Sequence, residues 1–216
     1  MVSSELSFSA SLVRKEMKCP AGAIRDYRIA IGFNPRYAEA RYNLALTLLY
    51  SPDGTTEAIP ELETALRLQP NYPEAHNALG MALARLPGRT PDAIREFQAA
   101  IRQRPHYAEA HGNLANALLR TPGRLDDAIS EDRTVLSDLP QFAQAHYNLA
   151  SALLEAGKAD EAVDEYRAAL RINPDLAEAH YNLAVVLSRM SGRGTESESD
   201  FNAAFRLRPD LRDLAR

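Results

Sequence analysis

The chain has 216 residues, a net charge of −4 and no tryptophan. This charge balance gives no reason to expect a nucleic-acid-binding surface or a surface that binds acidic lipids. Cys19 is the single cysteine, which excludes an intrachain disulfide and a four-thiolate metal site.

No targeting or membrane-spanning segment is expected. Charged residues interrupt the first twenty positions, where a signal peptide would need an apolar core. No run of about eighteen apolar residues occurs anywhere in the chain. The sequence therefore predicts a soluble, cytoplasmic protein.

Residues 1–35 are expected to form a degenerate N-terminal capping repeat. Residues 23–35 have the pattern of a second helix, and its first helix has to come from residues 5–18. Leu6, Val13 and Met17 give that segment only a weak apolar stripe.

Five similar segments follow, and a proline ends each of them. The predicted repeats span residues 36–70, 71–105, 106–140, 141–174 and 175–209. Each contains two phrases with helical periodicity, such as HYAEAHGNLA and DAISEDRTVL in the third repeat. Residues 210–216 begin a further, C-terminal capping helix. Because this end is short, two interpretations stay open: a fragment of a longer array, or an end that packs on a partner.

The breaks between the two phrases recur as regularly as the phrases. Glycine stands where the first helix is expected to end in a left-handed turn, at Gly88, Gly123, Gly157 and Gly192. Short polar residues are predicted to cap the second helices, namely Thr56, Thr90, Asp126, Asp160 and Thr195.

Small residues recur in both phrases, and we expect them at the helix crossings. They are Ala45, Gly80, Ala115, Ala150 and Ala184 in the first phrase, and Ala58, Ala93, Ala128 and Ala162 in the second. Side chains without bulk let helices approach closely, and one hairpin cannot bury its apolar face alone. The hairpins are therefore predicted to stack.

These intervals of leucine, small residue, glycine, aromatic residue and proline resemble the tetratricopeptide repeat over roughly residues 20–210. The resemblance implies an all-α fold, a right-handed α-solenoid of about six stacked antiparallel helix hairpins. It also implies a non-catalytic scaffold that binds a protein or an extended peptide in a concave groove lined by the first helices. The alternative function is a structural solenoid that self-associates through its ends, or a fragment of a larger multidomain repeat protein. The pentatricopeptide family, which binds RNA, has a similar period but lacks this spacing of alanine and glycine.

By the same resemblance, the groove-lining residues include Tyr42, Asn43, Asn77, Asn113, Asn116, Tyr147, Asn148, Tyr181 and Asn182. Asn43, Asn113, Asn148 and Asn182 form a ladder with one gap, at Ala78. An asparagine amide donates and accepts, so a row of them can hold an extended peptide. This arrangement is similar to the asparagine ladder of the O-linked N-acetylglucosamine transferase superhelix. Two simpler interpretations stay open: the asparagines face water, and the tyrosines pack against a neighbouring helix.

A basic edge is predicted at the far ends of the first helices, at Arg85, Arg120 and Arg189. Such an edge would steer an acidic ligand. The simpler explanation is that bases suit helix C-termini, and that acids opening the second helices neutralise them.

Histidines recur in step at His76, His111, His146 and His180, with Arg41 in the same place of the first repeat. Equivalent residues of adjacent helices lie about 8–10 Å apart, too far for one metal ion, so packing histidines are favoured. No nucleophile motif, phosphate loop or metal motif occurs. We therefore expect no enzyme activity, no cofactor and no metal.

Asp132 is the clearest departure from the repeat. The equivalent residues are Leu62, Phe97, Tyr166 and Phe201. A buried, unpaired carboxylate would cost several kcal/mol, so the favoured interpretation is a locally rotated helix with Asp132 near water, beside Arg133. The alternative is that the contact between the third and fourth full repeats is weakly packed.

Overall fold

The computed structural model describes residues 20–51 and 53–215, and within them the fold is all-α. These residues form eleven α-helices and one 3-10 helix, with no strand among them. The chain divides into two compact units, one ending at Pro105 and the other beginning at His106. This division falls at one of the predicted repeat boundaries, and each unit is described by itself.

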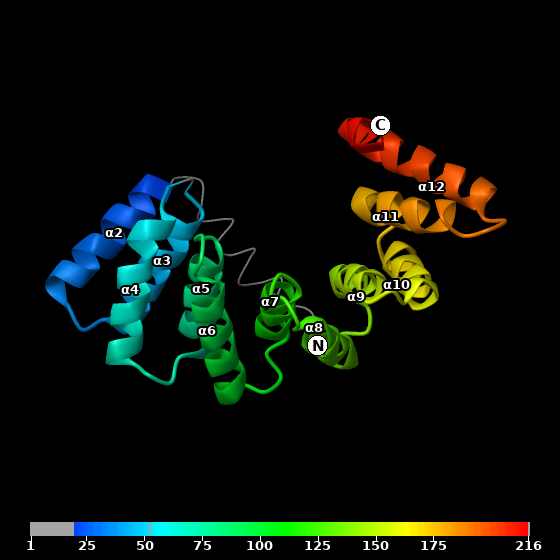
Figure 1. The fold of residues 1–216 in the computed structure, drawn as a ribbon. Coiled ribbons are helices and arrows are strands. Elements are labelled where there is room, and N and C mark those ends of the chain that lie inside the picture. Colours follow the sequence, from blue (N-terminus) through cyan, green and yellow to red (C-terminus); the bar gives the residue numbers. More distant parts are fainter. Residues whose placement is uncertain (1–19, 52, 216) are drawn as a thin grey trace. The chain divides into compact units, whose positions relative to one another are not determined.

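The first unit contains the helices from α2 to α6 (Figure 1). Their bounds are α2 (Pro20–Phe33), α3 (Ala38–Leu49), α4 (Thr55–Leu68), α5 (Pro73–Ala84) and α6 (Thr90–Gln103). α3 with α4 and α5 with α6 form antiparallel hairpins, while α2 packs on α3 and α4 packs on α5. Each helix therefore contacts the helices next to it in sequence, as expected of stacked hairpins.

The second unit contains three hairpins, α7–α8, α9–α10 and α11–α12. Their bounds are α7 (Ala108–Leu119), α8 (Leu125–Asp138), α9 (Ala143–Glu155), α10 (Ala159–Ile172), α11 (Ala177–Ser188) and α12 (Gly194–Leu207). α8 packs on α9, α10 packs on α11, and η1 (Pro209–Ala215), a 3-10 helix, packs on α12. The predicted all-α stack of antiparallel hairpins is confirmed, whereas its right-handed coiling stays a prediction.

The small residues lie at the helix crossings, as predicted. Ala45, Ala150 and Ala184 of the first helices are completely buried, as are Ala58, Ala93, Ala128 and Ala162 of the second helices. At Gly80 the approach is close, because an added Cβ would lie 2.5 Å from Cε1 of Phe97. An alanine there would displace the Phe97 ring, so glycine is the residue that fits.

The turns within the hairpins also follow the prediction. Gly88, Gly123, Gly157 and Gly192 have φ between 75° and 78°. This left-handed conformation is the one that glycine adopts without the steric cost of a Cβ.

The predicted helix caps are wrong. The residue before each second helix is Gly54, Arg89, Arg124, Lys158 or Arg193, and none of them makes a side-chain capping bond. The residues predicted as caps lie inside the first turn instead. Acids of that turn contact the preceding arginine, in the pairs Arg89–Asp92, Arg124–Asp127 and Arg193–Glu196. These acids stabilise the helix start through the macrodipole and an ion pair, without capping it.

At the N-terminal end, α2 is the expected second helix of the first hairpin, and residues 5–18 lie outside the described part of the chain. Phe33 and Ile29 of α2 have exposed fractions of 88% and 51%. At the C-terminal end, the expected capping helix is the 3-10 helix η1, whose Leu211 packs with Ala177 and Ala204.

Candidate functional site

Two predicted groove residues of the second unit, Tyr147 on α9 and Asn182 on α11, contact each other. Nδ2 of Asn182 donates a hydrogen bond to the hydroxyl of Tyr147 over 3.2 Å. Both side chains are partly exposed. The bond joins the first helices of two successive hairpins, and it brings the tyrosine position of one repeat next to the asparagine position of the following repeat.

The asparagines of the predicted ladder are all partly exposed on their first helices. Oδ1 of Asn148 accepts a hydrogen bond from Nε2 of Gln144 over 2.9 Å. Within the described part of the chain, the amide donors of Asn148 and the amide oxygen of Asn182 stay available for further bonds. Asn116, one turn beyond Asn113, is exposed.

In the first unit, the predicted groove residue Asn77, which precedes the gap of the ladder at Ala78, is buried. This side chain is 2% exposed, and its Nδ2 lies 3.9 Å from the sulfur of Met81. It therefore has little surface to offer a ligand. Asn43 is partly exposed, and the ring centroid of Tyr42 lies 4.9 Å from that of Tyr72, at the start of α5.

The tyrosines pack on the helices next to them, as the simpler interpretation has it. The ring centroid of Tyr147 lies 5.9 Å from that of Tyr166 in α10. The ring centroid of Tyr181 lies 5.7 Å from that of Phe201 in α12. Burial raises the pKa of Tyr147 and of Tyr166, so both hydroxyls stay protonated at neutral pH. These tyrosines combine a packing role with a partly exposed polar edge.

The three arginines of the predicted basic edge differ in what they contact. Nη1 of Arg85 donates to the backbone oxygen of Leu49 over 2.7 Å and so satisfies a carbonyl at the end of α3. Arg120 and Arg189 are exposed, and neither forms an ion pair with another described residue. In the neighbouring turns, the acids Asp92 and Asp127 at the start of the second helices pair with Arg89 and Arg124, which are not the three predicted edge arginines.

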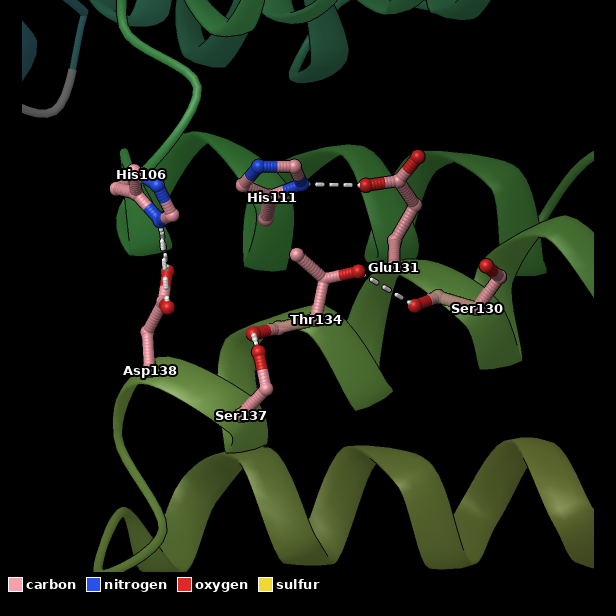
Figure 2. A network of polar contacts seen from close by, with 7 residues as sticks. All are labelled: His106, His111, Ser130, Glu131, Thr134, Ser137 and Asp138. Atoms are coloured by element: carbon pink, nitrogen blue, oxygen red, sulfur yellow. Dashed lines mark hydrogen bonds and ion pairs between the residues drawn. The ribbon is translucent and has the colours of Figure 1, made fainter.

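The recurring histidines join the two helices of each hairpin. Nδ1 of His146 lies 2.5 Å from the Glu165 carboxylate, and its Nε2 lies 3.2 Å from the backbone oxygen of Pro140. His76 and His180 make the same two contacts, with Glu96 and Pro70 and with Asp200 and Pro174. His111 lies 2.5 Å from Glu131, as Figure 2 shows beside the contact of His106 with Asp138.

Arg41 makes the same pair of contacts in the first full repeat. Its guanidinium donates to Glu61 over 2.6 Å and to the backbone oxygen of Pro35 over 3.0 Å. The position therefore requires a side chain with two donors that face two acceptors. A histidine that carries a proton on each ring nitrogen meets the same requirement.

This row of contacts between a histidine, or Arg41, and an acid was missed in the sequence, although its signal is there. An acid follows each histidine, or Arg41, by 19 or 20 residues. Recurrence of both partners in step predicts a contact between the two helices of a hairpin. The histidines are thus more than packing residues, because each one pairs with a carboxylate.

The interpretation of Asp132 as a residue near water is wrong. Its side chain is 3% exposed, and its Oδ1 is buried without a hydrogen-bond partner. α8 is continuous, and Ala128, Ile129 and Val135 are buried on the same side, so the helix is not rotated. Arg133 donates to Glu161 over 3.3 Å and so pairs with another carboxylate. Burial, and next the charge of Glu131, raise the pKa of Asp132 from 3.8 to about 7.

The described residues bear on two further expectations. Among residues 20–51 and 53–215, no three or more histidine, cysteine, aspartate or glutamate side chains are grouped so that they could hold a metal ion. In the same ranges, no helix has the length and apolar character needed to cross a bilayer.

Comparison with known families finds repeats of one kind along the chain. A model described as "TPR repeat" matches residues 55–86 and 150–191, and a model described as "Tetratricopeptide repeat" matches residues 88–136. Neither describes a catalytic domain. A search of the curated proteins found no match.

Comparison with solved structures finds similar folds at low sequence identity. A segment of MamA from Desulfovibrio magneticus RS-1 has a TM-score of 0.71 and 22% identity, covering 80% of this chain and 96% of that one. YrrB, described as "a TPR protein with an unusual peptide-binding site", has a TM-score of 0.67 and 21% identity, covering 85% of this chain and 93% of that one. The Cut9–Hcn1 structure has a TM-score of 0.72 and 18% identity, covering 88% of this chain and 37% of that one. At these identities the likeness concerns the fold.

Proposed function

Because the chain is built from tetratricopeptide repeats, we propose that it is a non-catalytic scaffold that binds an extended peptide along its first helices. The observation that supports the proposal is the bond between Asn182 and Tyr147, two partly exposed predicted groove residues on the first helices of successive hairpins. The description of YrrB as a protein with a peptide-binding site adds support by analogy. A cytoplasmic location fits this function and stays a prediction.

The asparagines would make the main contacts with the peptide backbone. Asn113, Asn148 and Asn182 stand at equivalent positions of the three first helices of the second unit. Asn148 and Asn182 each keep amide groups that the fold does not use. An amide that donates and accepts can pair with a peptide unit whatever its side chain, so the ladder would provide affinity and other residues would provide selectivity.

Peptide display tests this function. Random nonapeptides are selected on the wild-type chain, and the affinity of an enriched peptide is measured by isothermal titration calorimetry. Replacing Asn113, Asn148 and Asn182 together by alanine should weaken binding by at least about tenfold, since each lost amide pair contributes on the order of 1 kcal/mol.

The matched control changes two exposed asparagines outside the ladder, Asn71→Ala with Asn202→Ala, and should leave the affinity unaltered. Unchanged binding by the triple variant would remove the ladder from the mechanism. Failure of the wild-type chain to enrich any peptide would refute peptide binding itself.

Self-association through the chain ends is the second candidate function. The exposed side chains of Phe33 and Ile29 on α2 favour it, because apolar side chains of this size at the surface are typical of contact sites. Groove binding is preferred because the repeated polar positions extend along every first helix of the second unit.

A further inference from the structure

Two hairpins of the second unit share an aromatic contact between their first and second helices. In α9–α10, Tyr166 is fully buried, its ring faces that of Tyr147, and its hydroxyl lies 3.1 Å from Oγ of Ser151. In α11–α12, Phe201 and Tyr181 make the equivalent ring contact. A ring from the second helix therefore normally fills the space beside the groove-facing side chains.

The α7–α8 hairpin has neither ring. Asp132 occupies the place of Tyr166, and Gly112 occupies the place of Tyr147. A Cβ added to Gly112 would meet no atom of the surrounding structure within 4 Å, so this place is open. The unbroken α8 helix directs the Asp132 side chain toward the position that the Tyr166 ring takes in the next hairpin.

By analogy with the next repeat, we place Asn148 of α9 near position 112 of α7. In the next repeat the equivalent Asn182 donates to the Tyr147 hydroxyl. The matching partner of Asn148 would be a side chain at position 112, where glycine has none. The amide nitrogen of Asn148 therefore lacks the partner that Asn182 has.

Within residues 20–51 and 53–215, the Asp132 carboxylate forms no ion pair. Oδ1 of Asp132 is buried without a partner, the neighbouring Arg133 pairs with Glu161, and His111 pairs with Glu131. A buried carboxylate is costly unless a cation or a donor reaches it. Long basic side chains bury their apolar stems and deliver a charge at the end.

We propose that the Asp132 site, formed by Gly112, Asp132 and Asn148, binds a lysine or arginine side chain of the peptide and pairs its cationic end with the Asp132 carboxylate. This inference rests on the proposed function, and it adds a basic residue at one position of the ligand. The aliphatic part of the lysine or arginine side chain takes the space that the Tyr166 ring fills in the next hairpin. The Asn148 amide lies at the edge of this space. A tyrosine side chain of the ligand is the competing occupant, and the experiment separates the two.

The first experiment compares residue preferences. Random nonapeptides are selected on the wild-type chain, on Asp132→Asn, on Gly112→Tyr and on the control Asp126→Asn, which changes an exposed carboxylate of the same helix. Lysine or arginine should be enriched at one peptide position on the wild type and the control, and at none on the other two variants. Gly112→Tyr restores the repeat's own tyrosine in open space, so it should fold and still block the site.

The second experiment measures the charge itself. Norleucine in place of the enriched basic residue, which keeps the stem and removes the charge, should weaken binding to the wild type by about tenfold and leave binding to Asp132→Asn unaltered. Equal preferences on the wild type and Asp132→Asn, no effect of norleucine, or enrichment of tyrosine at this position would each overturn the inference.

A third measurement is independent of peptide binding. Titration with n-butylammonium should shift the carboxyl carbon resonance of Asp132 in a saturable way in the wild type, and should produce no saturable shift in Gly112→Tyr. A saturable shift without any enriched peptide would refute the proposed function and retain the cation site. Enriched peptides without a saturable shift or a basic preference would retain the function and refute the site.

Discussion

The α7–α8 and α9–α10 hairpins share the contacts that join their helices but differ in the side chains packed between them. Both place an alanine at the crossing, Ala115 or Ala150, and both join their helices through a histidine and a glutamate at 2.5 Å. In α9–α10 two tyrosine rings fill the space between the helices, whereas α7–α8 has Gly112 and a buried carboxylate there. The small residue and the histidine–glutamate contact are thus common to both hairpins, whereas the ring contact occurs in α9–α10 alone of the two.

The largest expected effect comes from a substitution that gives the α9–α10 hairpin the aspartate that α7–α8 has at the equivalent position. Tyr166→Asp removes a fully buried ring and leaves a carboxylate in its place. We expect the free energy of unfolding to fall by about 4 kcal/mol, from the lost packing and the burial of a charge. Guanidinium unfolding followed by circular dichroism measures it.

Tyr166→Phe is the control for this change, since it removes only the hydroxyl contact with Ser151 and should cost about 1 kcal/mol. If Tyr166→Asp proved as mild as Tyr166→Phe, the ring would contribute little, and the two hairpins would differ less than their contacts indicate.

The reverse change, Asp132→Leu, should stabilise the chain in a pH-dependent way. The pKa of Asp132 is raised from 3.8 to about 7 in the folded chain, so between these pH values the unfolded chain has released a proton that the folded chain retains. Stability contributed by this group is therefore full below pH 3.8 and lost as the pH rises to about 7. The difference corresponds to about 4 kcal/mol, which Asp132→Leu should recover at pH 8.

The gain should shrink to below about 2 kcal/mol at pH 5, where the folded carboxyl is neutral. Urea unfolding of the wild type, Asp132→Leu and Asp132→Asn at both pH values provides the measurement, with asparagine as the non-titrating substitute of similar shape. An equal gain at pH 5 and pH 8 would show that Asp132 does not titrate in this range.

The smallest expected effect concerns Gly112 on α7, where the structure leaves space for a side chain. Gly112→Ala should raise the free energy of unfolding by about 1 kcal/mol, because alanine favours the helix and its Cβ meets no atom within 4 Å. Gly80→Ala is the matched change in the first unit, where the Cβ would lie 2.5 Å from the Phe97 ring and should destabilise. Thermal unfolding of both variants would reveal the opposite signs, and a loss of stability in Gly112→Ala would show that this place is not open.

The helices, turns and crossings were predictable because their signals are local or strictly periodic. Positive φ at Gly157, for example, follows from a glycine that recurs between two amphipathic phrases. The prediction of the helix caps failed because a short polar residue near a helix start does not fix the first residue of the helix to better than one or two positions. Asp126 was expected before the helix and lies in its first turn, after Arg124.

The candidate site was predictable in part. The repeat identified which positions share a face, and the bond between Asn182 and Tyr147 agrees with that. It did not reveal that Asn77 is 2% exposed or that Arg85 bonds to a carbonyl of α3. The bond of Arg85 depends on α3, a helix that the repeat of Arg85 does not contain.

The sequence by itself determined the hairpin frame, because the spacing of small residues, glycines and prolines constrains each helix and turn through local sterics. Only the tertiary structure decided that the Asp132 carboxyl is buried without a partner and that each recurring histidine faces an acid. Those outcomes depend on which side chains of two packed helices come within bonding distance, and no single helix carries that information.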